Sequence, residues 1–162
     1  MRLRLRFDSF SLRQETRDAR THLQEEGIEV MYCDASHRAA FAELAETHFD
    51  SWWYLLFRPN LASPRPRPVL IAATRDSVAG FIGFADVNEN GSADFVLGVS
   101  PDYRRRGIAG VLVNVWASEV KAKGAVESQI DTGVNNPAQQ IYFGAGYEKL
   151  GQFPVHMTKT LG

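Results

Sequence analysis

The sequence predicts an α/β protein of the α+β kind, with a mixed, mostly antiparallel central sheet, helices on both faces and one parallel strand pair. Residues 69–99 show strand-like runs separated by short turns, which favours antiparallel neighbours. After residue 107 a helical apolar period is followed by a strand-like run, and a strand–helix–strand succession implies a parallel pair with a right-handed crossover. The chain has 162 residues, 44% hydrophobic and 23% charged, which suits one domain with a real core.

The N-terminal part predicts a strand followed by a helix. Arginine alternates with apolar residues over 1–7, so Leu3, Leu5 and Phe7 are expected on a buried face and the arginines in water. A charged helix is expected over 14–26. A basic arm that binds nucleic acid is the less favoured alternative, because the formal net charge is −1 and the pI about 6.4.

The elements that follow are predicted in order from period and turn residues. A strand is expected over 28–32, and Ser36 is a plausible N-cap for the next helix. The proline-rich run 64–68 predicts an exposed connection, because alternate prolines neither continue a helix nor donate to a sheet. The remaining elements are strands over 69–73, 78–87 and 93–99 with a two-residue hairpin turn at Asn90-Gly91, helices over 107–123 and 137–145, a strand over 126–132, and one or two strands within 147–161.

The segment between Val99 and Gly110 carries the clearest functional signal. A strand is predicted to end at Val99 and a helix to begin at about Gly107, with small residues at 107, 109 and 110. Free N–H groups at a helix start bind anions, and Arg104, Arg105 and Arg106 add forked donors that suit phosphate oxygens. The pattern matches neither a Walker loop nor a dinucleotide fingerprint. A pyrophosphate site is therefore predicted, against the alternative of a surface loop whose glycine only starts a helix.

Two motifs in this region resemble the GCN5-related N-acetyltransferase (GNAT) family. The first is similar to motif A of the family, Arg/Gln-x-x-Gly-x-Gly/Ala, and here reads Arg104-x-x-Gly107-x-Ala109 after Val99-x-Pro101. The second reads Asn135-x-x-Ala138-x-x-x-Tyr142-x-x-x-Gly146-Tyr147, where the family more often has Phe at the last position. The resemblance covers 28–161 by element order and is strong over 95–150.

The resemblance implies a GNAT-like fold in which acetyl-CoA lies where two parallel strands splay apart. In this chain those strands end at Val99 and Thr132. The pantetheine arm would pair with the backbone of Leu97 and Val99, and the pyrophosphate would lie on the N–H groups from Arg105 to Gly110. The cofactor-binding residues so implied are Leu97, Val99, Arg104, Arg105, Arg106, Gly107, Ile108, Ala109, Gly110, Asn135, Ala138 and Tyr142.

The resemblance further implies an N-acetyltransferase that passes the acetyl group of acetyl-CoA to a primary amine of a small molecule or peptide by direct attack. Tyr142 is then the proton donor to the leaving thiolate, against the alternative of a helix aromatic that packs on the sheet. A backbone N–H near Val99 would stabilise the oxyanion. Asp94 is the first candidate for the general base, with Asp131 and His48 as alternatives. The alternative function is a non-catalytic acyl-CoA-binding sensor or regulatory module.

The domain prediction is an N-terminal strand–helix extension over 1–27 and an acetyltransferase domain over 28–162. The extension resembles the joining segment of two-domain acetyltransferases, and an exposed edge of its strand would pair with a partner subunit in a possible homodimer. Trp52, Trp53 and Tyr54 fall where this family usually covers its acceptor pocket, although core packing is expected for at least two of them.

The remaining sequence features favour a cytoplasmic protein. Cys33 stands alone, so no disulfide forms within the chain, and it is expected in the core. The sequence shows no signal-peptide core and no apolar run long enough to span a membrane. His22, His37 and His156 show no metal-ligand spacing, so no metal is expected.

Overall fold

The protein is described by a computed structural model over residues 1–150. A four-stranded antiparallel sheet has the order β2-β3-β4-β5, formed by β2 (Glu29–Tyr32), β3 (Val69–Ala73), β4 (Val78–Gly83) and β5 (Val96–Val99). A second sheet has the order β6-β1-β7, formed by β6 (Glu127–Asp131), β1 (Arg2–Arg6) and β7 (Glu148–Lys149).

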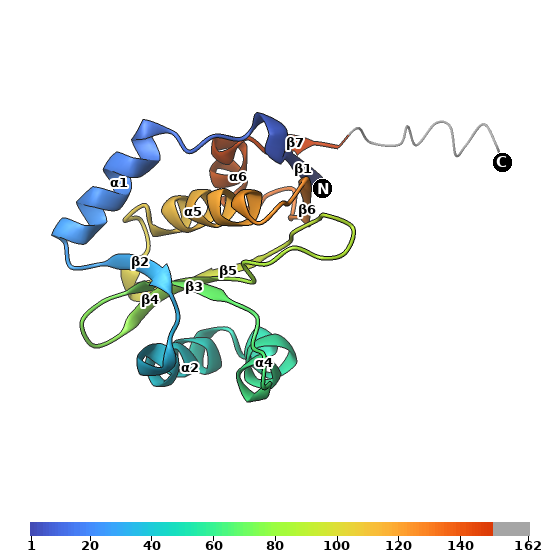
Figure 1. Ribbon diagram of the computed structural model, residues 1–162. Coiled ribbons are helices and arrows are strands. Elements are labelled where there is room, and N and C mark those ends of the chain that lie inside the picture. Colours follow the sequence, from blue (N-terminus) through green and yellow to red (C-terminus); the bar gives the residue numbers. More distant parts are fainter. Residues whose placement is uncertain (151–162) are drawn as a thin grey trace.

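Helices cover both faces of the four-stranded sheet, as the sequence predicts. Figure 1 shows α1 (Gln14–Glu25) and α5 (Ile108–Ala122) on one face, and α2 (Arg38–His48) and α4 (Arg58–Ala62) on the other. α6 (Gln139–Ala145) packs beside α5. The shorter segments are η1 (Phe7–Ser9), η2 (Ala35–His37), α3 (Asp50–Trp52), η3 (Trp53–Phe57) and η4 (Pro101–Tyr103).

The two sheets meet at one point instead of forming the single mixed sheet that the sequence predicts. The contact is an isolated parallel bridge between Ser92 and Glu127. Backbone hydrogen bonds run from Val126 N–H to the Gly91 oxygen (2.7 Å) and from Ala93 N–H to the Glu127 oxygen (3.1 Å). Beyond this bridge β5 pairs only with β4 among the described strands. The parallel contact is therefore confined to the start of β6, and β5 keeps one free edge.

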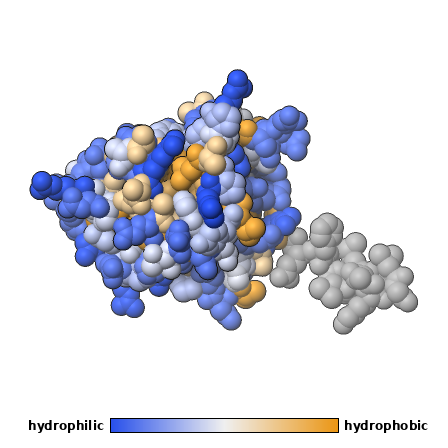
Figure 2. Space-filling view, turned by 90° about the horizontal axis from the view of Figure 1, so that it is seen from below, coloured by the Kyte–Doolittle hydropathy of each residue, from blue (hydrophilic) through white to orange (hydrophobic). Residues whose placement is uncertain are grey.

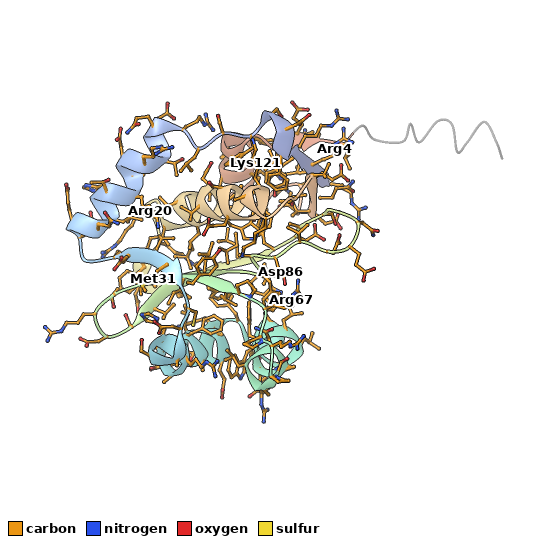
Figure 3. All side chains as sticks on the ribbon, viewed as in Figure 1. Arg4, Arg20, Met31, Arg67, Asp86 and Lys121 are labelled. Carbon is orange, nitrogen blue, oxygen red and sulfur yellow. The ribbon has the colours of Figure 1, made fainter. Side chains whose placement is uncertain are left out.

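The strand β1 lies in the centre of its sheet. It pairs antiparallel with β6 along its whole length and with β7 at Leu3 and Arg4. Leu3, Leu5 and Phe7 are buried and the arginines face outward, which confirms the predicted alternation. The expectation of an exposed edge is wrong, because strands of the same chain occupy both sides of β1. Figure 3 labels Arg4 on this strand, and Lys121 of α5, whose ammonium donates to the Phe10 oxygen just after η1.

Three predicted boundaries differ from the structure. Ser36 is not the cap: Asp34 caps the short η2 turn that leads into α2, since its carboxylate accepts from the Ser36 N–H at 2.9 Å, and α2 itself follows His37 with no side-chain cap. The strand predicted over 78–87 ends at Gly83. The turn at Asn90-Gly91 forms, with Gly91 at φ 78°, but it does not join paired strand ends: Gly83 already lies opposite Val96. Residues 84–95 instead leave the sheet after β4 and pass beside the start of β6, where Ser92 forms a bridge with Glu127.

Apolar side chains form two clusters, one on each face of the four-stranded sheet. The larger cluster contains the buried face of α5 together with Leu3, Leu5 and Phe7. The smaller one joins Phe41 of α2 to Phe57 and Phe81. Figure 2, seen from below in Figure 1, shows apolar patches scattered among hydrophilic groups on that side of the molecule. Among residues 1–150 no helix has both the length and the apolar character needed to cross a membrane.

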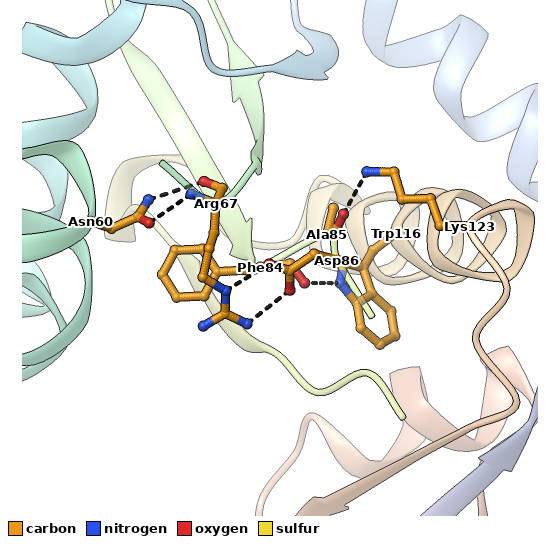
Figure 4. Close-up of polar contacts among 7 residues, drawn as sticks. All are labelled: Asn60, Arg67, Phe84, Ala85, Asp86, Trp116 and Lys123. Carbon is orange, nitrogen blue, oxygen red and sulfur yellow. Dashed lines mark hydrogen bonds and ion pairs between the residues drawn. The ribbon is translucent and has the colours of Figure 1, made fainter. Parts of the chain in front are cut away.

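The chain that leaves β4 is held by side chains from two sides (Figure 4). From α5, Trp116 donates its indole N–H to the Phe84 oxygen at 2.9 Å, and Lys123 donates to the Ala85 oxygen at 2.6 Å. On the other side, Arg67 forms two hydrogen bonds with Asp86, at 2.7 and 2.8 Å. These contacts fix residues 84–86, where residues 84–95 turn away from β4 toward β6.

The substitution Trp116→Phe is expected to lower the free energy of unfolding by about 2–4 kcal/mol. It leaves the buried Phe84 oxygen without its donor, which costs about 1–3 kcal/mol, and opens a small cavity. Urea unfolding followed by circular dichroism measures the change. Trp52→Phe, at a half-buried position with no indole hydrogen bond in the described part of the chain, is the matched control. An equal loss in both variants would contradict the role of the Trp116 hydrogen bond.

Candidate active site

A cleft of about 810 Å³ lies where β5 ends, α5 begins and the connection from β6 to α6 passes. It brings together most of the residues that the sequence predicts for the cofactor. The predicted residues that line it are Leu97, Val99, Arg104, Arg105, Gly107, Ile108, Ala109, Gly110, Ala138 and Tyr142. The first two come from β5, the next six from the start of α5 and the loop before it, and the last two from the region of α6. Residues far apart in sequence therefore share one cleft.

Three predicted residues do not line this cleft. Arg106 is exposed and places its guanidinium over the Tyr103 ring, 5.1 Å from the ring centroid. Asn135 is exposed, and its neighbour Asn136 lines the cleft instead. Asp94 is exposed, and its carboxylate accepts from the Gln129 N–H at 3.4 Å.

The start of α5 offers unpaired backbone donors to the cleft. Gly107 caps the helix in the left-handed conformation with φ 79°, and the first internal bond runs from Val111 N–H to the Gly107 oxygen at 3.2 Å. The N–H groups of residues 108–110 precede that bond and form no hydrogen bond within residues 1–150. With Arg104 and Arg105 beside them in the cleft lining, these amides have the donors and positive charge that suit an anion.

The space above this helix start is open. A Cβ atom added at Gly107 or Gly110 would meet no described heavy atom within 4 Å. Gly107 needs its positive φ, which L side chains adopt rarely, whereas Gly110 has an ordinary helical backbone. No described contact within the protein therefore requires a residue as small as glycine at position 110. A ligand that passes close to the helix would require one.

Tyr142 occupies the opposite wall of the cleft. Its ring packs 5.8 Å from the Phe95 centroid and 6.1 Å from the Tyr147 centroid, so it also has the packing role of the alternative interpretation. Its hydroxyl forms no hydrogen bond within residues 1–150, whereas the Tyr147 hydroxyl bonds to Ser128 at 2.7 Å. Burial raises the pKa of Tyr142 above the ordinary tyrosine value. The phenol is therefore protonated and available to a ligand at neutral pH.

One of the three candidate bases, Asp131, lines the cleft. Arg2 binds its carboxylate through two hydrogen bonds of 3.0 Å, and this pairing lowers the pKa of Asp131. His48 lines a separate hollow beside Ser100 and Asp102. A lowered pKa makes Asp131 a weak base. The neighbouring Thr132 also lines the cleft, with a buried hydroxyl that has no hydrogen-bond partner among the described residues.

Phe49, Trp52 and Gly98 make one further wall of the cleft, of which sequence reasoning placed only Trp52 near the acceptor and missed Phe49 and Gly98. The Phe49 and Trp52 rings stack 5.7 Å apart with an interplanar angle of 7°. A Cβ at Gly98 would lie 2.6 Å from Phe81 and 2.8 Å from Phe49, so only glycine lets these rings approach β5. A glycine inside a strand is the signal that identifies such a close approach.

The three aromatic residues 52–54 differ from one another in burial. Trp53 is buried in the core, Trp52 is half-buried on the cleft, and Tyr54 is 51% exposed. The expectation that at least two of the three belong to the core holds fully for Trp53 and in part for Trp52, which packs against the smaller cluster from the cleft side. Tyr54 is outside it, because consecutive residues of a helical turn point in different directions. Cys33 is partly buried against the smaller cluster, and burial raises the pKa of its thiol to about 11.

Two further predictions concern metal sites and the C-terminal strand. No group of three His, Cys, Asp or Glu side chains within residues 1–150 is placed to hold a metal ion. His156 and most of the predicted final strand region lie outside the described residues, which contain β7 at 148–149.

Several solved structures share this fold. The glucosamine N-acetyltransferase region of a fungal multi-domain GH3 beta-N-acetylglucosaminidase aligns with a TM-score of 0.72 and 13% identity, over 92% of this chain and 19% of that one. A GNAT-family acetyltransferase from Colwellia psychrerythraea gives 0.65 and 14%, over 90% and 51%. The aminoglycoside N-acetyltransferase AAC(6')-Iy with a bisubstrate analogue gives 0.58 and 19%, over 77% and 93%. At these identities the likeness concerns the fold alone.

The family comparison is decisive for the class of protein. No curated protein matches the chain. This chain spans 19% of the fungal protein and 51% of the Colwellia protein, so it corresponds to a part of each. The sequence model of the acetyltransferase (GNAT) family matches residues 32–147, which is well over half of the chain and includes both motifs. The chain therefore belongs to the GNAT family of acetyltransferases, which use acetyl-CoA.

Proposed function

We propose that this protein transfers the acetyl group of acetyl-CoA to a primary amine of a small molecule or peptide by direct attack. The observation that carries the proposal is that the unpaired amides of residues 108–110 and the unpaired hydroxyl of Tyr142 face one cleft. The first group suits a pyrophosphate, and the second suits the departing sulfur at the far end of the same cofactor.

The proposed pose of acetyl-CoA follows the free edge of β5. Its pantetheine arm adds to the backbone of Leu97 and Val99 in the manner of an extra strand, within the cleft that these residues and Ile130 to Thr132 line. Its pyrophosphate lies on the helix start beside Arg104 and Arg105. In this proposal Arg106 and Asn135 lie outside the cleft lining and contribute from the rim.

The proposed chemistry is a single acyl transfer. The neutral amine nitrogen attacks the thioester carbonyl carbon, and the carbonyl oxygen gains negative charge that a backbone N–H near Val99 stabilises. When the tetrahedral intermediate collapses the C–S bond breaks, Tyr142 donates its proton to the thiolate, and the amide product loses the proton of the attacking nitrogen to solvent. The phenolate of Tyr142 is then reprotonated from solvent. The raised pKa of Tyr142 keeps the donor loaded at neutral pH.

The general base has no direct candidate within the described cleft. Asp131 is paired with Arg2, and Asp94 does not line the cleft, so a role for Asp94 as base requires a water relay. We therefore propose that the amine enters in its neutral form, with Asp94 acting at most through water.

The pH profile of kcat/KM is expected to follow the titration of the amine substrate and not the titration of an enzyme group. Below the pKa of an alkylamine, about 10, the neutral fraction rises about tenfold per pH unit. Tyr142 keeps its proton over this range because its pKa is raised, so no falling limb appears below about pH 10. Initial rates between pH 6.5 and 9.5 test this. For a second amine whose pKa lies inside this pH range, an inflection is expected at the pKa of that amine; an inflection shared by both amines would reveal an enzyme base.

The test of the proposed function is thiol release from acetyl-CoA across a panel of amines, sugars and peptides. Amine-dependent release with an N-acetyl product supports it. Calorimetric binding of acetyl-CoA without release for any acceptor would favour the alternative, a non-catalytic acyl-CoA sensor.

We propose that residues 1–27 form an N-terminal extension of the acetyltransferase domain over 28–162. The family match begins at residue 32, yet β1 supplies the central strand of the second sheet. A version lacking residues 1–27 is therefore expected to lose the fold, not only an accessory contact.

A further inference from the structure

We infer that the acceptor is a monoamine carried on an aromatic or apolar body, which stacks on Trp52. This inference rests on the proposed function, because it assigns the acceptor to the part of the cleft that the proposed acetyl-CoA pose leaves unoccupied. It departs from the aminoglycoside substrates named for some of the similar structures.

The platform is rigid before any ligand arrives. Phe49 and Trp52 stack on each other, and each sets its edge against the buried Phe81, at 5.2 Å and 87° and at 6.2 Å and 88°. Phe81 is fully buried, whereas Phe49 and Trp52 are half-buried and line the cleft. Two aromatic side chains held by a third offer a flat apolar surface whose ordering costs little entropy.

The platform is close to the site of the chemistry. A Cβ on Gly98 would lie 2.8 Å from the Phe49 ring, so that ring abuts β5 between Leu97 and Val99. The thioester carbonyl is proposed to lie at this strand. An aromatic body that packs on the platform therefore has its amine within reach of the carbonyl when a short linker separates the two.

The charges in the cleft do not suit a polycation. Asp131 supplies the carboxylate that lines it within the described residues, and Arg2 already binds both oxygens of that group. The other ionic groups of the lining are Arg104 and Arg105. An acceptor with several ammonium groups would lose hydration in the cleft without gaining an ion pair to its lining, which opposes binding. A single amine that reacts in its neutral form avoids this cost.

The experiment compares phenethylamine, ethylamine and spermidine as acceptors for the wild type, Trp52→Ala, Trp52→Phe and Tyr54→Ala. For the wild type we expect kcat/KM to be at least about tenfold higher with phenethylamine than with either other amine, each compared at equal neutral-amine concentration. Trp52→Ala is expected to lower the phenethylamine value about tenfold while changing the ethylamine value and the KM for acetyl-CoA little. Trp52→Phe restores most of the loss, and Tyr54→Ala, at an exposed aromatic outside the cleft lining, has no effect.

A preference for spermidine, or an equal loss with phenethylamine and ethylamine in Trp52→Ala, overturns the inference while leaving the proposed function intact. If no amine is acetylated, the proposed function fails instead. Calorimetric titration of phenethylamine into the protein saturated with CoA then tests the platform by itself. Binding that Trp52→Ala removes supports it, and absence of binding overturns it.

Discussion

Replacing Gly110 by glutamate is expected to abolish acetyl-CoA binding while leaving the melting temperature unchanged or slightly raised. A Cβ atom at this position meets no described heavy atom within 4 Å outside the adjoining backbone of its own helix, and the backbone there is helical, where glycine is a poor residue. The new carboxylate would occupy the space above the free amides of residues 108–110 and repel the pyrophosphate. Like charges brought together cost several kcal/mol, so affinity should fall by at least about 100-fold.

The matched control is Gly144→Glu. Gly144 also lies within a helix, α6, with open space around it, and it is not part of the cleft lining. Calorimetry with acetyl-CoA and a thermal melt of both variants separate binding from folding. Gly107 is a poorer choice, because its positive φ adds backbone strain to any substitution. Retained affinity in Gly110→Glu would place the pyrophosphate elsewhere.

Replacing Tyr142 by phenylalanine is expected to lower kcat by about 100-fold or more and to change the Kd for acetyl-CoA by less than about twofold. General acid catalysis contributes about 10²–10⁴-fold, and the hydroxyl makes no hydrogen bond within residues 1–150 whose loss would disturb the fold. The ring contacts with Phe95 and Tyr147 remain. Single-turnover rates with a reactive amine and calorimetry with acetyl-CoA measure the two effects.

The control for this variant is Tyr147→Phe, in the same motif. Tyr147 donates to Ser128 in the core, so its loss should lower the free energy of unfolding by about 1–3 kcal/mol without a comparable fall in kcat of the folded protein. Unchanged turnover in Tyr142→Phe would assign the proton to water and leave Tyr142 as a packing residue. Equal losses of kcat in both variants would point to a structural cause.

Much of the fold follows from local signals. The alternation of arginine and leucine in β1, the helical period of α5 and the positive φ at Gly107 and Gly146 are properties of short segments. They depend on side-chain spacing and on backbone sterics, which a sequence displays directly. The two motifs likewise identified the residues of the α5 start and Tyr142 that share the cleft.

Long-range pairing decided the rest. The neighbours of β1 lie about 125 and 145 residues away in the chain, and no local pattern shows that β1 enters the centre of a sheet. The diversion of residues 84–95 depends on Trp116, Lys123 and Arg67, which come from other elements. The ion pair that occupies Asp131 also depends on β1, since Arg2 lies opposite Asp131 in the β1–β6 ladder.

The sequence by itself determined the family-type motifs, the helix start that offers amides to an anion, and the tyrosine that faces it. Those features are local, so the residue types and their spacing are sufficient to show them. The tertiary structure alone decided that Asp131 is paired with Arg2, which tryptophan lines the cleft and how β5 keeps an open edge. Each of these depends on which distant segment packs against the residue, and that packing is a property of the whole folded chain.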